Sequence, residues 1–153
     1  MIQRKQSLYI LVAVILTVIC LCSQIGTFTI VGLGVSRVYN LWYTLPLGGH
    51  RLATWPLMAL LLVVASSGLY SIFLFRKRKI QALFCMLNVL LIIGWHIWFF
   101  VVALTVGEQS WGTVRFRPSW PAVLPVISLI LFLLARKAIL ADEKLVRSVD
   151  RIR

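Results

Sequence analysis

The chain has 153 residues, of which 61% are hydrophobic and 13% are charged, and its mean hydropathy is +0.95. Soluble domains average about 25% charged residues, so this composition excludes an ordinary soluble protein and indicates a single-domain integral membrane protein. The net charge of +12 comes from 16 basic and 4 acidic residues. Because the bases cluster at the ends of apolar runs, they indicate membrane topology and anionic lipid headgroups, and no specific nucleic acid is expected.

The first apolar run predicts a transmembrane helix over about residues 7–25. Arg4 and Lys5 precede it, and because basic residues resist translocation they place the N-terminus in the cytoplasm. The run is longer than the ~7–15 apolar residues of a signal peptide, and no A-x-A-like site follows it. We therefore interpret it as a span that is not cleaved.

Residues 26–53 form the first outer loop, and their composition is typical of strands. β-branched and aromatic residues fill two runs, 27–31 and 38–44, which glycines and a proline punctuate. A third such run, 113–116, lies in the second outer loop, residues 105–119. We expect the three runs to pair into one small sheet above the helices. That sheet would present four arginines outward: Arg37, Arg51, Arg115 and Arg117.

Two long runs without a charged residue, about 54–75 and 80–104, predict the second and third transmembrane helices. The former contains Ser67 and Ser71, whose small-xxx-small spacing favours close helix packing. A tight basic turn between two spans is retained in the cytoplasm, among the lipid headgroups, and it ties the helices into a hairpin. Four residues form this basic cluster: Arg76, Lys77, Arg78 and Lys79.

A polar stripe follows one side of the third predicted helix. At 100° per residue, Gln81, Asn88 and His96 fall, with a cysteine and a tryptophan, within about a third of the circumference. The stripe should face the bundle interior, because Asn and His are unfavourable in lipid. Hydrogen bonding between helices is one interpretation. A haem ligand, a quinone contact or a proton relay at His96 is the other, although a b-type haem usually needs two axial His and His50 lies in the outer loop.

The fourth helix is predicted over about 120–141, with Pro121 at its start and Pro125 as a possible bend. Residues 138–153 continue it as an amphipathic cytoplasmic tail. Acidic residues oppose binding to anionic lipid, so the mixed charges of the tail favour specific pairing, with the basic cluster or with a partner's bases. Five tail residues form the candidate docking surface: Asp142, Glu143, Arg147, Asp150 and Arg151.

The distribution of basic residues tests this topology. Of the 16 bases, twelve fall on the predicted cytoplasmic side and four in the outer loops, which agrees with four spans and both termini inside. The predicted fold class is therefore an all-α membrane protein with four transmembrane helices. It carries a small extracytoplasmic β cap and a cytoplasmic amphipathic C-terminal helix.

Both ends of the chain carry recognisable motifs. Residues 1–4 read MIQR, residues 6–9 read QSLY and residues 142–151 read DEKLVRSVDR, and Arg117-Pro118 precedes the last helix. These motifs resemble a Bacteroidota family of small four-helix integral membrane proteins, catalogued as a domain of unknown function. The resemblance implies the four-helix fold and an inner-membrane location, and it transfers no catalytic residue.

The predicted layout also resembles that of the claudins, with four helices, both termini inside and a stranded first outer loop. Asn40-Leu41-Trp42 is similar to the Gly-Leu-Trp of that group, but the paired cysteines that should follow are absent. The likeness is therefore one of layout alone.

For function, the sequence favours a non-catalytic accessory or scaffold subunit of an inner-membrane assembly. The chain is small, and it has no acidic residue within a predicted span and no recognisable nucleophile–base pair or metal motif. We expect other membrane-protein subunits as partners, and no catalytic residue, cofactor or metal. Two alternatives remain. One is a transporter or channel element that acts as an oligomer, and the other is a redox or quinone-associated subunit that uses His96.

Overall fold

The computed structural model describes residues 3–30, 32, 34–45, 48–75, 77–107 and 114–150. Side chains are described over the same ranges except at residues 3–5, 106–107 and 147–150. In this part of the chain helices and strands follow one another in this order: α1 (Gln3–Cys22), β1 (Gln24–Ile30), β2 (Gly34–Tyr39), β3 (Tyr43–Thr44), β4 (His50–Arg51), α2 (Trp55–Phe73), α3 (Arg78–Gly107), β5 (Val114–Pro118), the 3-10 turn η1 (Trp120–Val123) and α4 (Leu124–Asp150).

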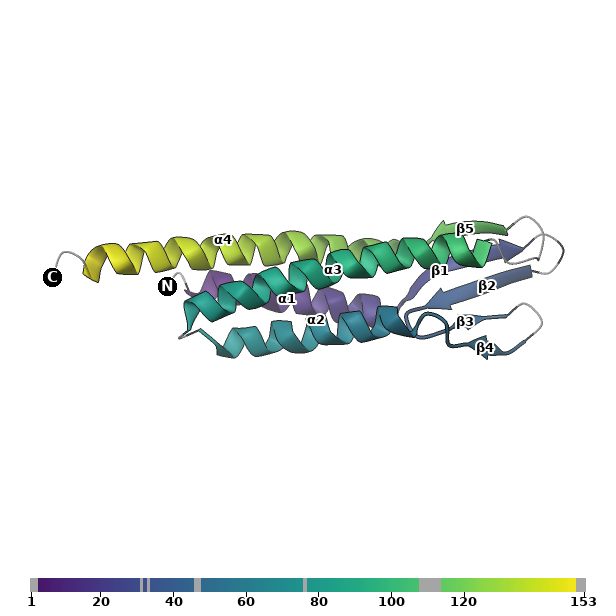
Figure 1. Cartoon of the computed structure of the whole chain (residues 1–153), viewed down its shortest axis with the longest axis horizontal. Coiled ribbons are helices and arrows are strands. Elements are labelled where there is room, and N and C mark those ends of the chain that lie inside the picture. Colours follow the sequence, from purple (N-terminus) through teal and green to yellow (C-terminus); the bar gives the residue numbers. More distant parts are fainter. Residues whose placement is uncertain are drawn as a thin grey trace.

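The four α-helices lie side by side along the long axis of the molecule, and the strands gather at one end of them (Figure 1). We call this the sheet end. Helix α1 begins at the opposite end, and α4 returns there and projects beyond the other three helices. We call this opposite end, where both described ends of the chain lie, the terminal end.

Each helix packs against two neighbours, because α1 contacts α2 and α4, and α3 contacts the same two. Gly68 of α2 lies at a close approach between helices. A Cβ built there would lie 2.7 Å from Val14 Cγ2 of α1 and 3.3 Å from Phe132 Cζ of α4. The predicted small residues flank this point, with Ser71 buried and Ser67 half-buried. Glycine therefore lets α2 pack closely against α1 and α4 here, with Asn88 of α3 also 3.5 Å from the Cβ position.

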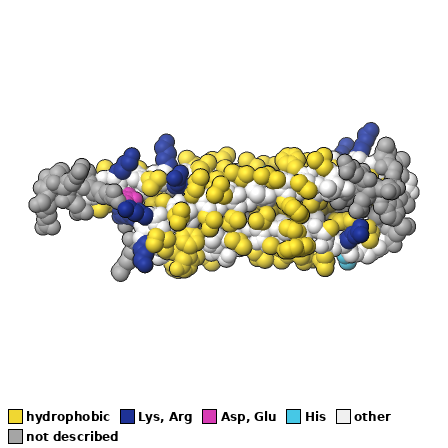
Figure 2. Space-filling view, in the orientation of Figure 1, with side chains coloured by type: hydrophobic (Ala, Val, Ile, Leu, Met, Phe, Trp, Pro, Cys, Tyr) yellow, Lys and Arg dark blue, Asp and Glu magenta, His cyan; other side chains and the backbone are white. Residues whose placement is uncertain are grey.

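Three helical segments are long and apolar enough to cross a membrane: Trp55–Phe73, Arg78–Thr105 and Trp120–Val146. In α1 the segment Gln6–Cys22 is apolar but shorter. Hydrophobic side chains cover the middle of the face in Figure 2, and Lys and Arg lie toward both ends. An exposed apolar surface of this size is unsuited to water. It indicates a multi-pass membrane protein.

The five strands form one antiparallel sheet in the order β4-β3-β2-β1-β5. The predicted pairing of the two outer loops is confirmed, because β1 lies between β2 and β5. Phe28 of β1 is opposite Phe116 of β5, with ring centroids 4.8 Å apart. Phe116 in turn contacts Phe99 of α3, which joins the sheet to the bundle. The four arginines are exposed, as expected: Arg37, Arg51, Arg115 and Arg117.

Several predicted boundaries at the sheet end were wrong. The first helix ends at Cys22 instead of residue 25, because Gln24–Ile30 joins the sheet. The predicted run 38–44 is not one strand, since residues 40–42 turn between β2 and β3, and the short strand β4 was missed. Such two-residue strands carry little sequence signal. Val31 and Thr113, at the ends of two predicted runs, lie outside the described residues.

The bounds of the other three helices also differ from the prediction. Helix α2 is shorter than residues 54–75, and α3 is longer than residues 80–104, since it begins at Arg78. The fourth helix is preceded by η1, so Pro125 lies in the first turn of α4, where a missing N–H breaks no hydrogen bond. Helix α4 then runs without interruption into the predicted tail, as far as Asp150.

Candidate functional site

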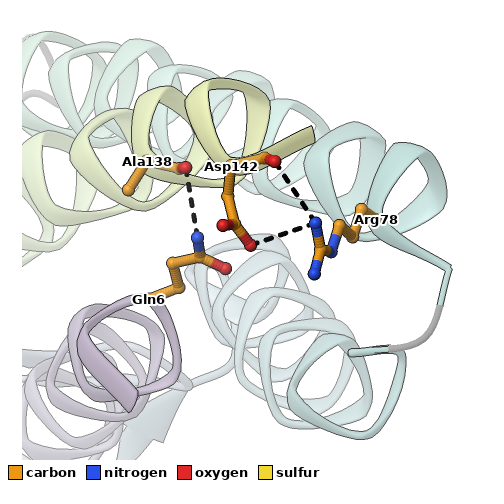
Figure 3. Close-up of polar contacts among 4 residues, drawn as sticks. All are labelled: Gln6, Arg78, Ala138 and Asp142. Carbon is orange, nitrogen blue, oxygen red and sulfur yellow. Dashed lines mark hydrogen bonds and ion pairs between the residues drawn. The ribbon is translucent and has the colours of Figure 1, made fainter. Parts of the chain in front are cut away.

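Polar side chains from three helices meet at the terminal end of the bundle. Arg78 Nη1, in the first turn of α3, lies 3.2 Å from Asp142 Oδ2 of α4 and also donates a hydrogen bond to the Asp142 carbonyl at 3.3 Å. Gln6 Nε2 of α1 donates to the Ala138 carbonyl, one turn earlier on α4, at 3.1 Å (Figure 3). This terminal cluster therefore fastens α4 to both α3 and α1.

The ion pair between Arg78 and Asp142 is largely shielded from solvent. Asp142 is only 8% exposed, although it lies in the stretch of α4 that the sequence predicts to be an amphipathic cytoplasmic tail. Its Oδ2 is within ion-pair distance of Arg78 Nη1 but accepts no hydrogen bond from a described group. The stabilisation is thus mainly electrostatic. The Coulombic attraction is stronger here than on an open surface because both side chains are largely buried, and removing one partner would leave the other as an uncompensated buried charge.

The other residues of the predicted basic cluster and tail have different surroundings. Lys77 and Lys79 are exposed, and Arg76 lies outside the described residues. Glu143 is half-buried and makes an interaction of its own. The side chains of Arg147 and Asp150, and the whole of Arg151, lie outside the described part. The structure therefore brings one tail acid, Asp142, to one base of the cluster.

The predicted polar stripe of α3 faces the bundle interior at Gln81 and Asn88, which are 2% and 0% exposed. Asn88 Oδ1 accepts a hydrogen bond from Ser67 Oγ of α2 at 2.5 Å, and Asn88 Nδ2 has no described partner. His96 is only half-buried. Its Nδ1 lies 2.9 Å from the Ile92 carbonyl, and its Nε2 has no described partner.

A second polar cluster, which the sequence analysis missed, lies at the sheet end. Asn40 is 1% exposed, and its Nδ2 donates to the Cys20 carbonyl, near the C-terminus of α1, at 2.8 Å. Asn40 Oδ1 accepts from Trp95 Nε1 of α3 at 3.2 Å. Nearby, Thr54 Oγ1 donates to the Tyr39 carbonyl, so the turn after β2 is fastened to three helices. An Asn within a strand-like run is the signal that could have revealed this turn.

Replacing Asn40 with alanine is expected to lower the free energy of unfolding by about 2 kcal/mol, since it leaves the buried indole N–H of Trp95 unpaired and removes one of the two hydrogen bonds to the Cys20 carbonyl, which still accepts from Ser23 N–H. Thermal unfolding in a mild detergent measures this loss. Ser66→Ala is the matched control, because Ser66 is exposed and bonds only within its own helix. Equal stability of the Asn40 and Ser66 variants would show that the Asn40 contacts contribute nothing.

The three cysteines and two histidines are dispersed. Cys20 and Cys85 are buried, Cys22 is exposed, and all three are free. His50 is exposed on β4, with its ring 5.9 Å from that of Trp42. Among the described residues no three His, Cys, Asp or Glu side chains come together in a way that could hold a metal ion. The polar groups that do meet are suited to joining helices.

Comparison with known proteins adds one positive result. Residues 2–152 match a family described as a domain of unknown function, DUF4293, so the match covers nearly the whole chain. No curated protein matches the sequence. The match extends through both ends of the chain, where the sequence motifs were found.

Proposed function

We propose that this chain, which belongs to the DUF4293 family, is a non-catalytic accessory or scaffold subunit of an assembly in the inner, cytoplasmic membrane. The family match supports the resemblance that the motifs at both ends of the chain carry. That the family belongs to the Bacteroidota and that the membrane is the inner one are parts of the proposal.

The proposed topology has four spans, with the terminal end in the cytoplasm and the sheet outside. Helix α1 is proposed as the fourth span, because its apolar segment Gln6–Cys22 reaches the lower limit of about 17 residues for a membrane-spanning helix and Arg4 and Lys5 precede it. It also lies alongside the three longer apolar segments (Figure 1). Lys77, Lys79, Arg136 and Lys137 lie at the terminal end and favour the cytoplasmic side there. With the stranded outer loops, this gives the claudin-like layout.

The observation that carries the accessory role is that, among the described residues, polar side chains inside the bundle are mainly used to join the chain's own helices. Arg78 pairs with Asp142, Ser67 with Asn88, and Asn40 with Trp95. A catalytic or transport site would instead need convergent polar groups facing a cavity. We therefore infer that this protein acts through its surfaces, by binding other subunits of a membrane assembly.

The part of α4 beyond Asp142 is the surface that we propose for a partner. Helix α4 projects past the other helices at the terminal end (Figure 1). Leu145 and Val146 are 58% and 45% exposed there, next to charged residues. Asp142 itself is paired with Arg78, so the proposed docking surface consists of the tail residues that follow: Glu143, Lys144, Leu145, Val146, Arg147, Asp150 and Arg151.

Stoichiometric co-purification after mild solubilisation tests the accessory role. We expect the intact chain to retain a membrane-protein partner at a fixed ratio, and the variant Leu145→Gln with Val146→Gln to lose it. Ala141→Gln is the control, because Ala141 is an exposed residue of the same helix just before the tail. A chain that purifies alone from its native membrane contradicts the accessory role, and equal retention by both variants contradicts docking at the tail.

The redox alternative has one specific observation in its favour, the unpartnered Nε2 of the half-buried His96. A haem or flavin bound there would give a visible absorbance band in the purified protein, and His96→Ala would remove it. The transporter alternative requires an oligomer, because the described part of α2 and α3 contains no acidic residue to line an ion path.

A further inference from the structure

A groove lies between α3 and α4 near the terminal end of the bundle. It is a hollow of about 220 Å³, and a second hollow of about 250 Å³ adjoins it along α3. The two share Leu83 and Met86, so they lie next to each other along α3, and we refer to them together as the groove. The first is lined by Lys79, Ala82, Leu83, Met86, Arg136 and Leu140, and the second by Leu83, Phe84, Met86, Leu87 and Leu90.

The walls and the rim of this groove differ in chemistry. Every wall residue is apolar, whereas two cations, Lys79 of α3 and Arg136 of α4, lie where the groove nears the terminal end. No acidic side chain lines it. Within the described part of the chain, neither Lys79 nor Arg136 forms an ion pair. The ion pair near them joins Arg78 to Asp142.

We propose that this groove binds one anionic phospholipid, with its phosphate between Lys79 and Arg136 and an acyl chain along Ala82, Met86 and Leu87. Charge complementarity identifies the occupant. The two unpaired cations match a phosphate group, and the apolar walls match the acyl chain that a phospholipid carries beside its phosphate. The groove also opens on the apolar surface that faces the bilayer. The inference rests on the proposed membrane embedding and is independent of the accessory role.

A simpler explanation for the two cations is that each extends toward the headgroups and is attracted to any anionic surface. The two explanations differ in position dependence. A general surface charge depends on how many bases the terminal end carries, whereas a site depends on which bases are removed. Lys77 and Lys137 provide the comparison, because both are exposed bases at the same end and neither lines the groove.

The experiment measures lipid retention by the full chain, purified in a neutral detergent, by native mass spectrometry. The probes are dioleoyl phosphatidylglycerol and dioleoyl phosphatidylcholine, which share acyl chains and differ in charge. We expect one molecule of the anionic lipid to bind in preference to the zwitterionic one. Lys79→Gln with Arg136→Gln should weaken its binding about tenfold or more, and Lys77→Gln with Lys137→Gln less than about twofold.

The part of the groove proposed for the acyl chain is tested by a substitution that fills it with a tryptophan side chain. Leu83 is 67% exposed and lines both hollows, so Leu83→Trp should fold normally and compete with the chain in the groove. Ile93→Trp, at an exposed position of α3 outside the groove, is its control. Equal losses in the two double-charge variants, no preference for the anionic lipid, or unchanged binding in Leu83→Trp would each overturn the proposal. None of these results affects the co-purification test.

Discussion

Replacing Gly68 with alanine is expected to destabilise the bundle by about 1–3 kcal/mol, the usual range for overpacking a filled core. The added Cβ would lie 2.7 Å from Val14 Cγ2, a distance that real Cβ contacts do not show. Val14 is β-branched, so its side chain has few rotamers with which to give way. Phe132 Cζ, 3.3 Å away, closes the other side. Thermal unfolding in detergent, followed by size-exclusion chromatography, measures the loss.

Two further variants isolate this contact from other effects of removing a glycine. Gly94→Ala in α3 meets nothing within 4 Å, so it should keep or raise stability, because alanine is a better helix former by up to ~1 kcal/mol. Val14→Ala combined with Gly68→Ala should recover part of the loss by making room for the new methyl group. The packing account is wrong if Gly68→Ala and Gly94→Ala have the same stability.

Replacing Arg78 with methionine is expected to lower the free energy of unfolding by about 3 kcal/mol, since it leaves the buried Asp142 carboxylate without its cation. This estimate lies at the low end for buried pairs because the side chains of Arg78 and Asp142 are 23% and 11% exposed. Methionine keeps most of the apolar length of the side chain, so the change removes charge more than packing. Chemical or thermal unfolding in detergent gives the measurement.

A double-mutant cycle shows whether the loss comes from this pair. Adding Asp142→Asn removes the buried charge, so the double variant should regain more than half of the stability that Arg78→Met loses. Lys77→Met, at an exposed neighbouring base, should change stability by no more than about 0.5 kcal/mol. Additive effects of the two single changes would contradict a coupled ion pair.

Much of the helical architecture follows from the sequence, because length and apolarity are strong signals. The uncharged run before the basic cluster and the one after it became α2 and α3, and the amphipathic tail became the continuation of α4. The sheet was also predictable as a sheet, since β-branched runs in two outer loops can pair only with one another. The polar stripe at Gln81 and Asn88 was correctly placed toward the interior.

The contacts that fix the bundle were harder to predict, because they depend on tertiary geometry. The small-residue spacing of Ser67 and Ser71 indicated close packing on this part of α2, but not that a Cβ at Gly68 would meet three other helices, whereas one at Gly94 meets none. The sequence placed Asp142 among tail acids that could pair with the basic cluster or with a partner's bases, but only the fold shows which acid meets which base, by placing Asp142 beside Arg78. Asn40 was noticed only for its likeness to another family's motif, whereas its role is to join α1 and α3.

The most direct test of the central claim is the side of the membrane on which the two ends of the bundle lie. An alkaline phosphatase domain inserted at Gly48, near β4, and a fluorescent protein fused after Arg153 each report one side, and a protease-sensitive tag before Met1 reports the N-terminus. We expect the phosphatase to be active outside, the fluorescent protein to fluoresce inside, and the tag to be protected in intact cells. A cytoplasmic signal from the Gly48 insertion, or a tag cleaved from outside, would contradict the four-span topology.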